Sequence, residues 1–139
     1  MPLKPLVPFD QSHLDLFAQN NFMIYNWAMP VEDCQMIIKK FEDVVRYDKT
    51  QVDTFNTGHK EFTEIDIDKY KGSDYWKEPR EKFIKMMEDY ITRFKQNLNI
   101  KPLDFAPVID MENIRIKKYM PNDKDQFKVH VDVVRSMGD

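Results

Sequence analysis

The residues whose types and spacing indicate chemistry lie near the end of the chain, in the triplet His130-Val131-Asp132. On a β-strand, residues two apart project from the same face, so an imidazole and a carboxylate would lie side by side there. A neutral imidazole and a carboxylate suit Fe(II), and such a site leaves other coordination positions open for reactants. A histidine and an aspartate at this spacing also occur together by chance, and the alternative is an exposed strand on which both face water.

The triplet lies in a segment with the alternation of a β-strand. Gln126–Val133 places apolar side chains at every second position, and His130 is one of the polar residues between them. Asn113–Met120 alternates in the same way, and the polar cluster Pro121–Asp125 separates the two segments. We therefore predict an antiparallel hairpin that presents His130 on its polar face. The apolar row of the second strand is Phe127, Val129, Val131 and Val133, so Phe127 is expected in the core.

Two amphipathic helices are predicted upstream of this hairpin. The first begins at Pro30, and the acidic residues Glu32 and Asp33 complement the positive end of its dipole. The second spans about Tyr75–Asn97, with Pro79 in the first turn, where a missing N–H costs little. Helices followed by strands predict an α+β fold with an incomplete antiparallel sheet. The remaining segments are predicted as an extended lead-in at Met1–Phe9, a short helix at Asp10–Asn20, strands at Phe22–Trp27 and Glu61–Ile67, and a loop at Asp48–Lys60.

Composition limits the classes of function. A chain of 139 residues with 42% hydrophobic residues is long enough for one globular domain. The net charge of −3 gives no electrostatic reason to bind nucleic acid or an anionic membrane. Cys34 is the one cysteine, which favours a reducing compartment, and the sequence contains no apolar run of membrane-spanning length. We therefore expect a cytoplasmic protein.

The stretch IRIKKYMPNDKDQFKVHVDV resembles the entry to the double-stranded β-helix of Fe(II)/2-oxoglutarate-dependent oxygenases of the prolyl 4-hydroxylase type, as found in phages and marine bacteria. The likeness consists of a strand ending in Tyr119, a turn, and Phe127 three residues before His130, which opens the His-x-Asp motif with Asp132. It implies a jelly-roll core beginning at residues 111–139, preceded by a helical and strand region at residues 1–110, in one domain.

The resemblance also implies roles for residues. His130 and Asp132 would be iron ligands, and Tyr119 would lie near the 2-oxoglutarate, although an aromatic cap at a strand end is an equal alternative for Tyr119. The cofactor would be Fe(II), the co-substrate 2-oxoglutarate, and the substrate a peptidyl proline or a small molecule. No further catalytic residue is assigned.

The sequence departs from this family in one respect that bears on activity. The family places a second His and then a basic residue several strands after His-x-Asp, whereas His13 and His59 both precede the motif here and Arg135 follows it too closely. We therefore expect a truncated form that is inactive by itself. The alternative is a non-catalytic α+β remnant that self-associates through its last strands, because unpaired strand edges favour pairing with another chain.

Three other positions are expected to have no chemical role. His59 is interpreted as a loop histidine, since it follows Gly58 in a polar segment, and a metal ligand is the less favoured alternative. Asp66 and Asp68 flank Ile67 with no histidine nearby, so both are expected to face solvent.

Overall fold

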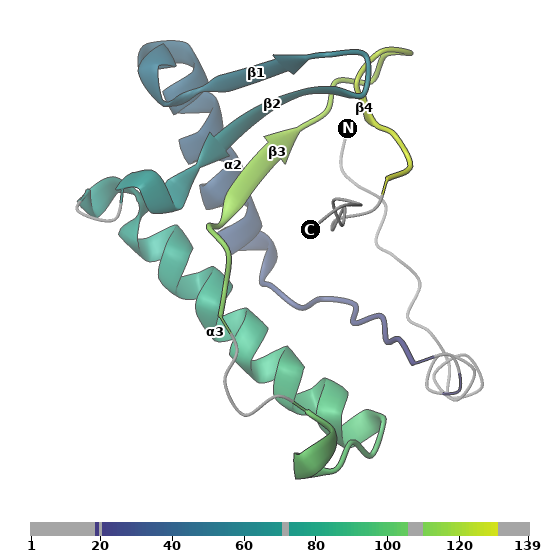
Figure 1. The fold of residues 1–139 in the computed structure, drawn as a ribbon. Coiled ribbons are helices and arrows are strands. Elements are labelled where there is room, and N and C mark those ends of the chain that lie inside the picture. The colour runs from purple at the N-terminus through teal and green to yellow at the C-terminus, as the bar shows by residue number, and fades with distance from the viewer. Residues whose placement is uncertain (1–18, 20, 71–72, 106–109, 131–139) are drawn as a thin grey trace, which may run out of the picture. The chain divides into compact units, whose positions relative to one another are not determined.

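The computed structural model describes residues 19, 21–70, 73–105 and 110–130, and these form an α+β fold with an open antiparallel sheet (Figure 1). The predicted fold class is therefore confirmed, whereas its jelly-roll character stays a prediction. The expected lead-in and first short helix lie outside the described residues, apart from the helical Gln19. The main elements are α2 (Val31–Tyr47), β1 (Asp53–Asn56), β2 (Lys60–Asp66), α3 (Asp74–Asn97), β3 (Arg115–Lys118) and β4 (Gln126–Phe127).

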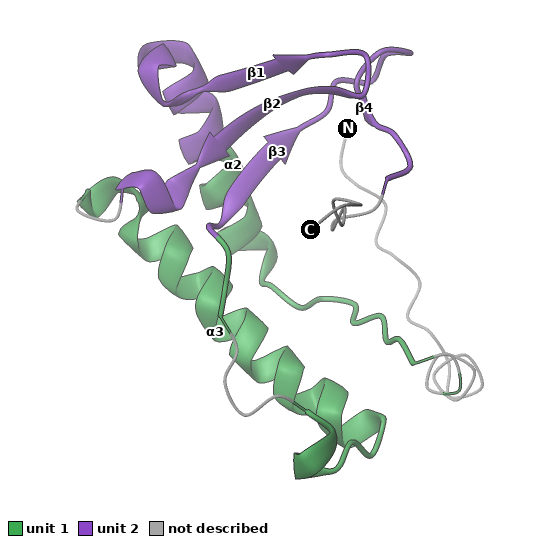
Figure 2. Cartoon of the chain, in the orientation of Figure 1, with its two compact units in different colours: residues 1–39, 71–112 green, residues 40–70, 113–139 purple. Residues whose placement is uncertain are grey.

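The chain divides into two compact units (Figure 2). The first unit consists of residues 1–39 and 71–112 and holds the first half of α2 and all of α3. The second unit consists of residues 40–70 and 113–139 and holds the second half of α2 and the sheet. The predicted site residues that the structure describes therefore belong to the second unit.

Helix α2 begins at Val31, one residue after the predicted start at Pro30. The carbonyl oxygen of Pro30 accepts hydrogen bonds from the backbone N–H groups of Asp33 and Cys34, both at 3.1 Å. Glu32 and Asp33 lie in the first turn, where the helix dipole favours negative charge. Ile38 is 57% exposed, and it lies about 100° around the helix from the buried Ile37. The buried residues of α2 are Ile37, Phe41 and Val44.

Helix α3 begins one residue earlier than predicted. The Ser73 hydroxyl oxygen accepts a hydrogen bond from the Tyr75 backbone N–H at 3.2 Å and so caps the helix. The placement of Pro79 in the first turn is wrong, because Pro79 is the sixth residue of a helix that starts at Asp74. A proline at that depth removes one helical hydrogen bond, and the complete burial of its ring offsets part of the cost.

The predicted strand at Phe22–Trp27 is also wrong. The described residues there are irregular and end in a turn, and Trp27 has a left-handed backbone with φ of 60°. Side chains of α3 hold this segment instead of a sheet neighbour. The Tyr25 hydroxyl donates a hydrogen bond to Asn97 Oδ1 at 2.7 Å, and its ring lies 4.9 Å from that of Tyr90. An aromatic-rich segment therefore serves here as packing for a helix.

Strand β2 is the centre of the sheet. It pairs with β1 in an antiparallel hairpin that sets Phe55 opposite Phe62, and Gly58, with φ of 74°, lies in the turn. The prediction of a strand at Glu61–Ile67 is confirmed within one residue. The predicted loop at Asp48–Lys60 is wrong where it contains β1. This four-residue strand at the end of the strand order has mostly exposed side chains, so its sequence lacks the alternation of a half-buried strand.

Strands β3 and β4 do not form the predicted hairpin with each other. Both pair antiparallel with β2: β3 along Thr63–Asp66, and β4 at Lys60 and Glu61. Both strands therefore run in the same direction along one side of β2. Residues 119–125 between them leave the sheet and return to it (Figure 1). This polar segment, called the excursion below, is therefore a loop between two strands that run the same way, and not the turn of a hairpin.

The two faces of the sheet differ in chemistry. Ile65 lies on one face with its cross-strand partner Ile116, and it is completely buried. Lys118 faces the same way and forms a 2.6 Å ion pair with Glu42 of α2, so the second half of α2 covers this face. The opposite face carries the aromatic and charged side chains of the candidate site.

Candidate functional site

One face of the sheet gathers the aromatic rings and charges of the second unit. Residues two apart on β2 share a face, and their cross-strand partners lie on that face with them. Phe62 is the aromatic centre of this face and is 3% exposed. The face consists of Lys60, Phe62, Glu64 and Asp66 of β2, with their opposite residues Phe127, Phe55, Lys117 and Arg115.

A series of ring contacts joins two of the predicted site residues. Tyr119 follows β3, and its ring centre lies 5.2 Å from that of Phe62. Phe62 in turn lies 5.9 Å from Phe127, which stacks on the His130 imidazole at 3.9 Å with an angle of 24° between the planes. Phe127, expected in the core, is half-buried and forms the wall against which His130 rests. The sheet therefore brings Tyr119 and His130 to one aromatic cluster, the rings of Phe55, His59, Phe62, Tyr119, Phe127 and His130.

His130 reaches this cluster from outside a strand. Strand β4 ends at Phe127, and Val129, expected in the apolar row, is fully exposed, so the predicted strand to Val133 is wrong over residues 128–130. His130 Nδ1 lies 2.8 Å from the backbone oxygen of Lys128. This contact assigns the ring proton to Nδ1 and the lone pair to Nε2 in the neutral imidazole. Asp132, the other expected ligand, lies outside the described residues.

Two lysines bring positive charge to the same rings. The Nζ atom of Lys60 lies 5.1 Å from the centre of the Phe127 ring, and that of Lys117 lies 5.0 Å from it. Lys117 also lies 5.0 Å from the Phe62 ring centre. Ammonium groups at this range are attracted by the negative face of an aromatic ring. The two contacts place positive charge beside the aromatic cluster, where an anionic ligand would be favoured.

The acidic residues beyond the cluster are structural. Asp66 and Asp68, expected to face solvent, are 4% and 6% exposed, so that expectation is wrong. Asp66 Oδ2 accepts a hydrogen bond from Asn113 Nδ2 at 3.1 Å, and Asp68 Oδ2 accepts one from the Ile114 backbone N–H at 2.7 Å. These bonds, with the Arg115 guanidinium 3.7 Å from Asp66, compensate the burial of charge. The two carboxylates therefore fix the start of β3.

The excursion between β3 and β4 is held by its own side chains. Asp125 Oδ2 accepts a hydrogen bond from the Met120 backbone N–H at 2.7 Å, and Asp125 Oδ1 accepts one from Asn122 Nδ2 at 3.1 Å. These bonds hold the pKa of Asp125 below its usual value, with the backbone bond from Met120 the larger cause. The loop is therefore closed on itself by hydrogen bonds between its own residues.

His59, which the sequence favoured as a plain loop histidine, is brought to this cluster by the fold. It lies at the end of the β1–β2 turn, and its ring centre is 6.0 Å from that of His130, with the planes at 84°. Its backbone oxygen accepts a hydrogen bond from the Lys128 N–H at 3.1 Å, which ties the turn to the segment that carries His130. No pattern in the sequence links residues 59 and 130. Only the pairing of β4 with β2 brings them together.

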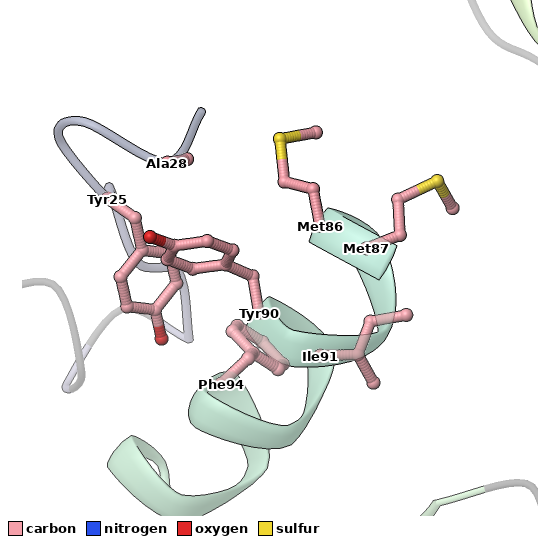
Figure 3. Close-up of a pocket in the computed structure, with 7 residues that line it drawn as sticks. All are labelled: Tyr25, Ala28, Met86, Met87, Tyr90, Ile91 and Phe94. Carbon is pink, nitrogen blue, oxygen red and sulfur yellow. The ribbon is translucent and has the colours of Figure 1, made fainter. Parts of the chain in front are cut away.

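A separate hollow of about 390 Å³ lies on the first unit (Figure 3). Its side chains come from α3 and from the segment that precedes α2, and Figure 3 shows the rings of Tyr25 and Tyr90 beside each other. Burial raises the pKa of the Tyr25 hydroxyl, which is consistent with its role as a donor to Asn97. The hollow is apolar and carries no acid–base pair. Its lining residues are Tyr25, Ala28, Met86, Met87, Tyr90, Ile91 and Phe94.

Comparison of the chain with known proteins finds no matching family model, no matching curated protein and no matching solved structure. Among the described residues, no group of three or more His, Cys, Asp or Glu side chains is arranged to hold a metal ion. None of the described helices has both the length and the apolar character needed to cross a membrane.

Proposed function

We propose that this chain is the N-terminal part of an Fe(II)/2-oxoglutarate-dependent oxygenase of the prolyl 4-hydroxylase type, with a jelly-roll core. In this proposal His130 and Asp132 bind the iron, Tyr119 lies at the co-substrate, and the substrate is a peptidyl proline or a small molecule in the cytoplasm. The observation that carries the proposal is the contact between His130 Nδ1 and the Lys128 carbonyl oxygen, 2.8 Å apart.

That contact matches what a metal-binding histidine needs. Such histidines donate one ring N–H to a carbonyl or carboxylate, which fixes the tautomer and aims the other nitrogen at the metal. The stacking of Phe127 at 3.9 Å fixes the plane of the ring as well. His130 therefore fits a metal ligand that binds through Nε2. When bound, Fe(II) supplies oxidation of a C–H bond at the expense of O2 and 2-oxoglutarate.

The surroundings of His130 suit a dianionic co-substrate. Tyr119 is 43% exposed, so its ring is accessible to a ligand while Phe62 supports it from one side. Lys60 and Lys117 place positive charge near the same rings. A hydroxyl and two ammonium groups can hold the carboxylates of 2-oxoglutarate by charge-assisted hydrogen bonds.

The proposal is tested by metal-dependent binding of 2-oxoglutarate. Mn(II), a redox-stable substitute for Fe(II), is titrated by electron paramagnetic resonance, and 2-oxoglutarate binding is measured by calorimetry with and without it. We expect loose Mn(II) binding that His130→Ala abolishes, and 2-oxoglutarate binding that requires the metal and weakens in Tyr119→Phe. Two results would overturn the proposal: nanomolar metal affinity that survives His130→Ala, or 2-oxoglutarate binding that is the same without metal.

A further inference from the structure

We infer that His59 is a second imidazole ligand at the metal site of His130, so that one metal ion joins the β1–β2 turn to the segment after β4. This inference adds a ligand to the proposed function and rests on the metal site at His130, but not on the oxygenase chemistry. The observation behind it is the approach of the two rings, whose centres lie 6.0 Å apart.

This separation is compatible with a shared metal ion. An imidazole nitrogen binds a first-row metal at about 2.1 Å, which places the ring centre roughly 3.2 Å from the ion. Two rings on one ion therefore lie no more than roughly 6.4 Å apart, and about 4.5 to 5.2 Å apart at bond angles of 90° to 109°. The observed 6.0 Å falls within the limit, and an approach of about 1 Å brings the rings to the preferred geometry.

The surroundings allow that approach and keep the pair together. His59 is exposed and lies at the end of the β1–β2 turn, so rotation of its side chain meets little packing resistance while His130 stays stacked on Phe127. Phe127 contacts both rings, stacked on His130 at 3.9 Å and edge-on to His59 at 5.6 Å. The backbone bond from the Lys128 N–H to the His59 oxygen fixes the two segments at 3.1 Å. The scaffold of the site is therefore formed by backbone pairing and one aromatic wall, and it does not depend on the metal.

Two imidazoles also define the class of metal. Nitrogen ligands suit Fe(II), Co(II), Ni(II), Cu(II) and Zn(II), whereas Mg(II) and Ca(II) prefer oxygen. Affinity at a site of this kind rises from Mn(II) and Fe(II) towards Ni(II) and Cu(II). We therefore expect Co(II) to bind more tightly than Mn(II), and Mg(II) to leave both rings unaffected.

The inference is tested with Co(II) on the full 139-residue chain. The side-chain resonances of the three histidines are followed by nuclear magnetic resonance, and affinity is measured by calorimetry at pH 7.5. We expect Co(II) to broaden the resonances of His59 and His130 together at the same low metal concentrations, before those of His13. His59→Gln should weaken Co(II) binding by at least the roughly tenfold loss typical of removing an outer-shell partner.

The controls separate this inference from the proposed function. His13→Gln removes the third imidazole of the chain, leaves both proposed ligands in place and should leave Co(II) affinity unchanged. The His59 side chain can be replaced without loss of its backbone bond to Lys128. Affinity that falls in His130→Gln and not in His59→Gln would overturn the inference and leave the function standing. Paired broadening of both rings with no metal-dependent 2-oxoglutarate binding would support the inference and overturn the function. Equal loss in His13→Gln would show adventitious binding and overturn the inference.

Discussion

The burial of Asp66 leads to a prediction about what holds the sheet together. This carboxylate accepts hydrogen bonds from the backbone N–H groups of Asp68 and Lys69, at 3.1 and 3.2 Å, and from Asn113 Nδ2 at 3.1 Å. It therefore joins the end of β2, the 3₁₀ turn that follows it, and the residues that lead into β3. Asp66→Ala removes all of these acceptors at once.

The cost follows from the number and kind of these bonds. A hydrogen bond to a charged group contributes about 1.5–3 kcal/mol, and a buried donor that loses its acceptor carries its own penalty. Asp66→Ala loses three such bonds but also removes the cost of burying the carboxylate. The net loss in the free energy of unfolding is about 3–4 kcal/mol. Since a domain of this size has about 5–15 kcal/mol in total, Asp66→Ala should lower Tm by about 10 °C.

Urea unfolding followed by far-ultraviolet circular dichroism measures this loss. Asp66→Asn should have an intermediate effect. Its amide keeps one oxygen for the two backbone donors but turns an NH₂ group towards Asn113. We therefore expect it to lose about half as much unfolding free energy as Asp66→Ala. Asp53→Ala is the matched control. Its carboxylate forms an exposed 3.6 Å ion pair with Lys69, and removal of such a pair costs less than about 1 kcal/mol.

The three variants together can refute the reasoning. If Asp66→Ala is no more destabilising than Asp53→Ala, the buried bonds contribute nothing beyond what water supplies. If Asp66→Asn costs as much as Asp66→Ala, the shared oxygen does not hold the backbone donors of Asp68 and Lys69.

Two further predictions concern the excursion after β3 and the assembly of the chain. Because the pKa of Asp125 is lowered in the folded state, its contribution to stability is present at neutral pH and is lost as pH falls through that pKa. The amide chemical shift of Met120 should therefore titrate with a midpoint below about 3.9. A midpoint at or above that value would contradict the assigned bond. We expect self-association through the last strands, since β3 lies at one end of the strand order and Val129 is fully exposed. Sedimentation at micromolar concentration should give a dimer or larger species that Val129→Lys weakens, and a monomer would refute it.

The elements that could be predicted from sequence are those with a strong local period. Helix α3 repeats its apolar residues over 24 residues, so its extent was predicted within one residue. Strand β2 was also predicted within one residue, from the short run that contains Phe62, Ile65 and Ile67 rather than from a period. Strand β1 was missed because its exposed side chains leave no such signal. It becomes a strand because it pairs with β2, and such pairing cannot be read from the sequence of β1 itself.

Pairing partners could not be predicted from alternation. The alternating pattern of Asn113–Met120 indicates a strand but contains no information about which strand lies beside it. The two segments were predicted to pair with each other because a turn cluster separates them, whereas β2 offered one long edge to both. The same limit explains His59, whose neighbour in space is 71 positions away in sequence.

The burial of two charged residues was also not predicted from the sequence. Asp66 and Asp68 were expected to face solvent because carboxylates are rarely buried without partners. Their partners are backbone N–H groups and Asn113, which local sequence does not reveal. Of the candidate site, the sequence predicted His130 and Tyr119 as individual residues, while the cluster that joins them depends on the strand order.

Strands β3 and β4 lie along the same side of β2, so the number of residues that connect them does not determine how far apart they lie on the sheet. Each strand docks on β2 by its own hydrogen bonds, so the residues between them need only close a gap whose ends are already fixed. Lengthening such a connection is inexpensive, at about 0.6 kcal/mol for each doubling of its length. Insertions between Tyr119 and Phe127 should therefore leave both rings in place on the sheet. A sequence signature for this fold should allow a gap of variable length there, and the same connection is the natural place to graft a peptide or a reporter group.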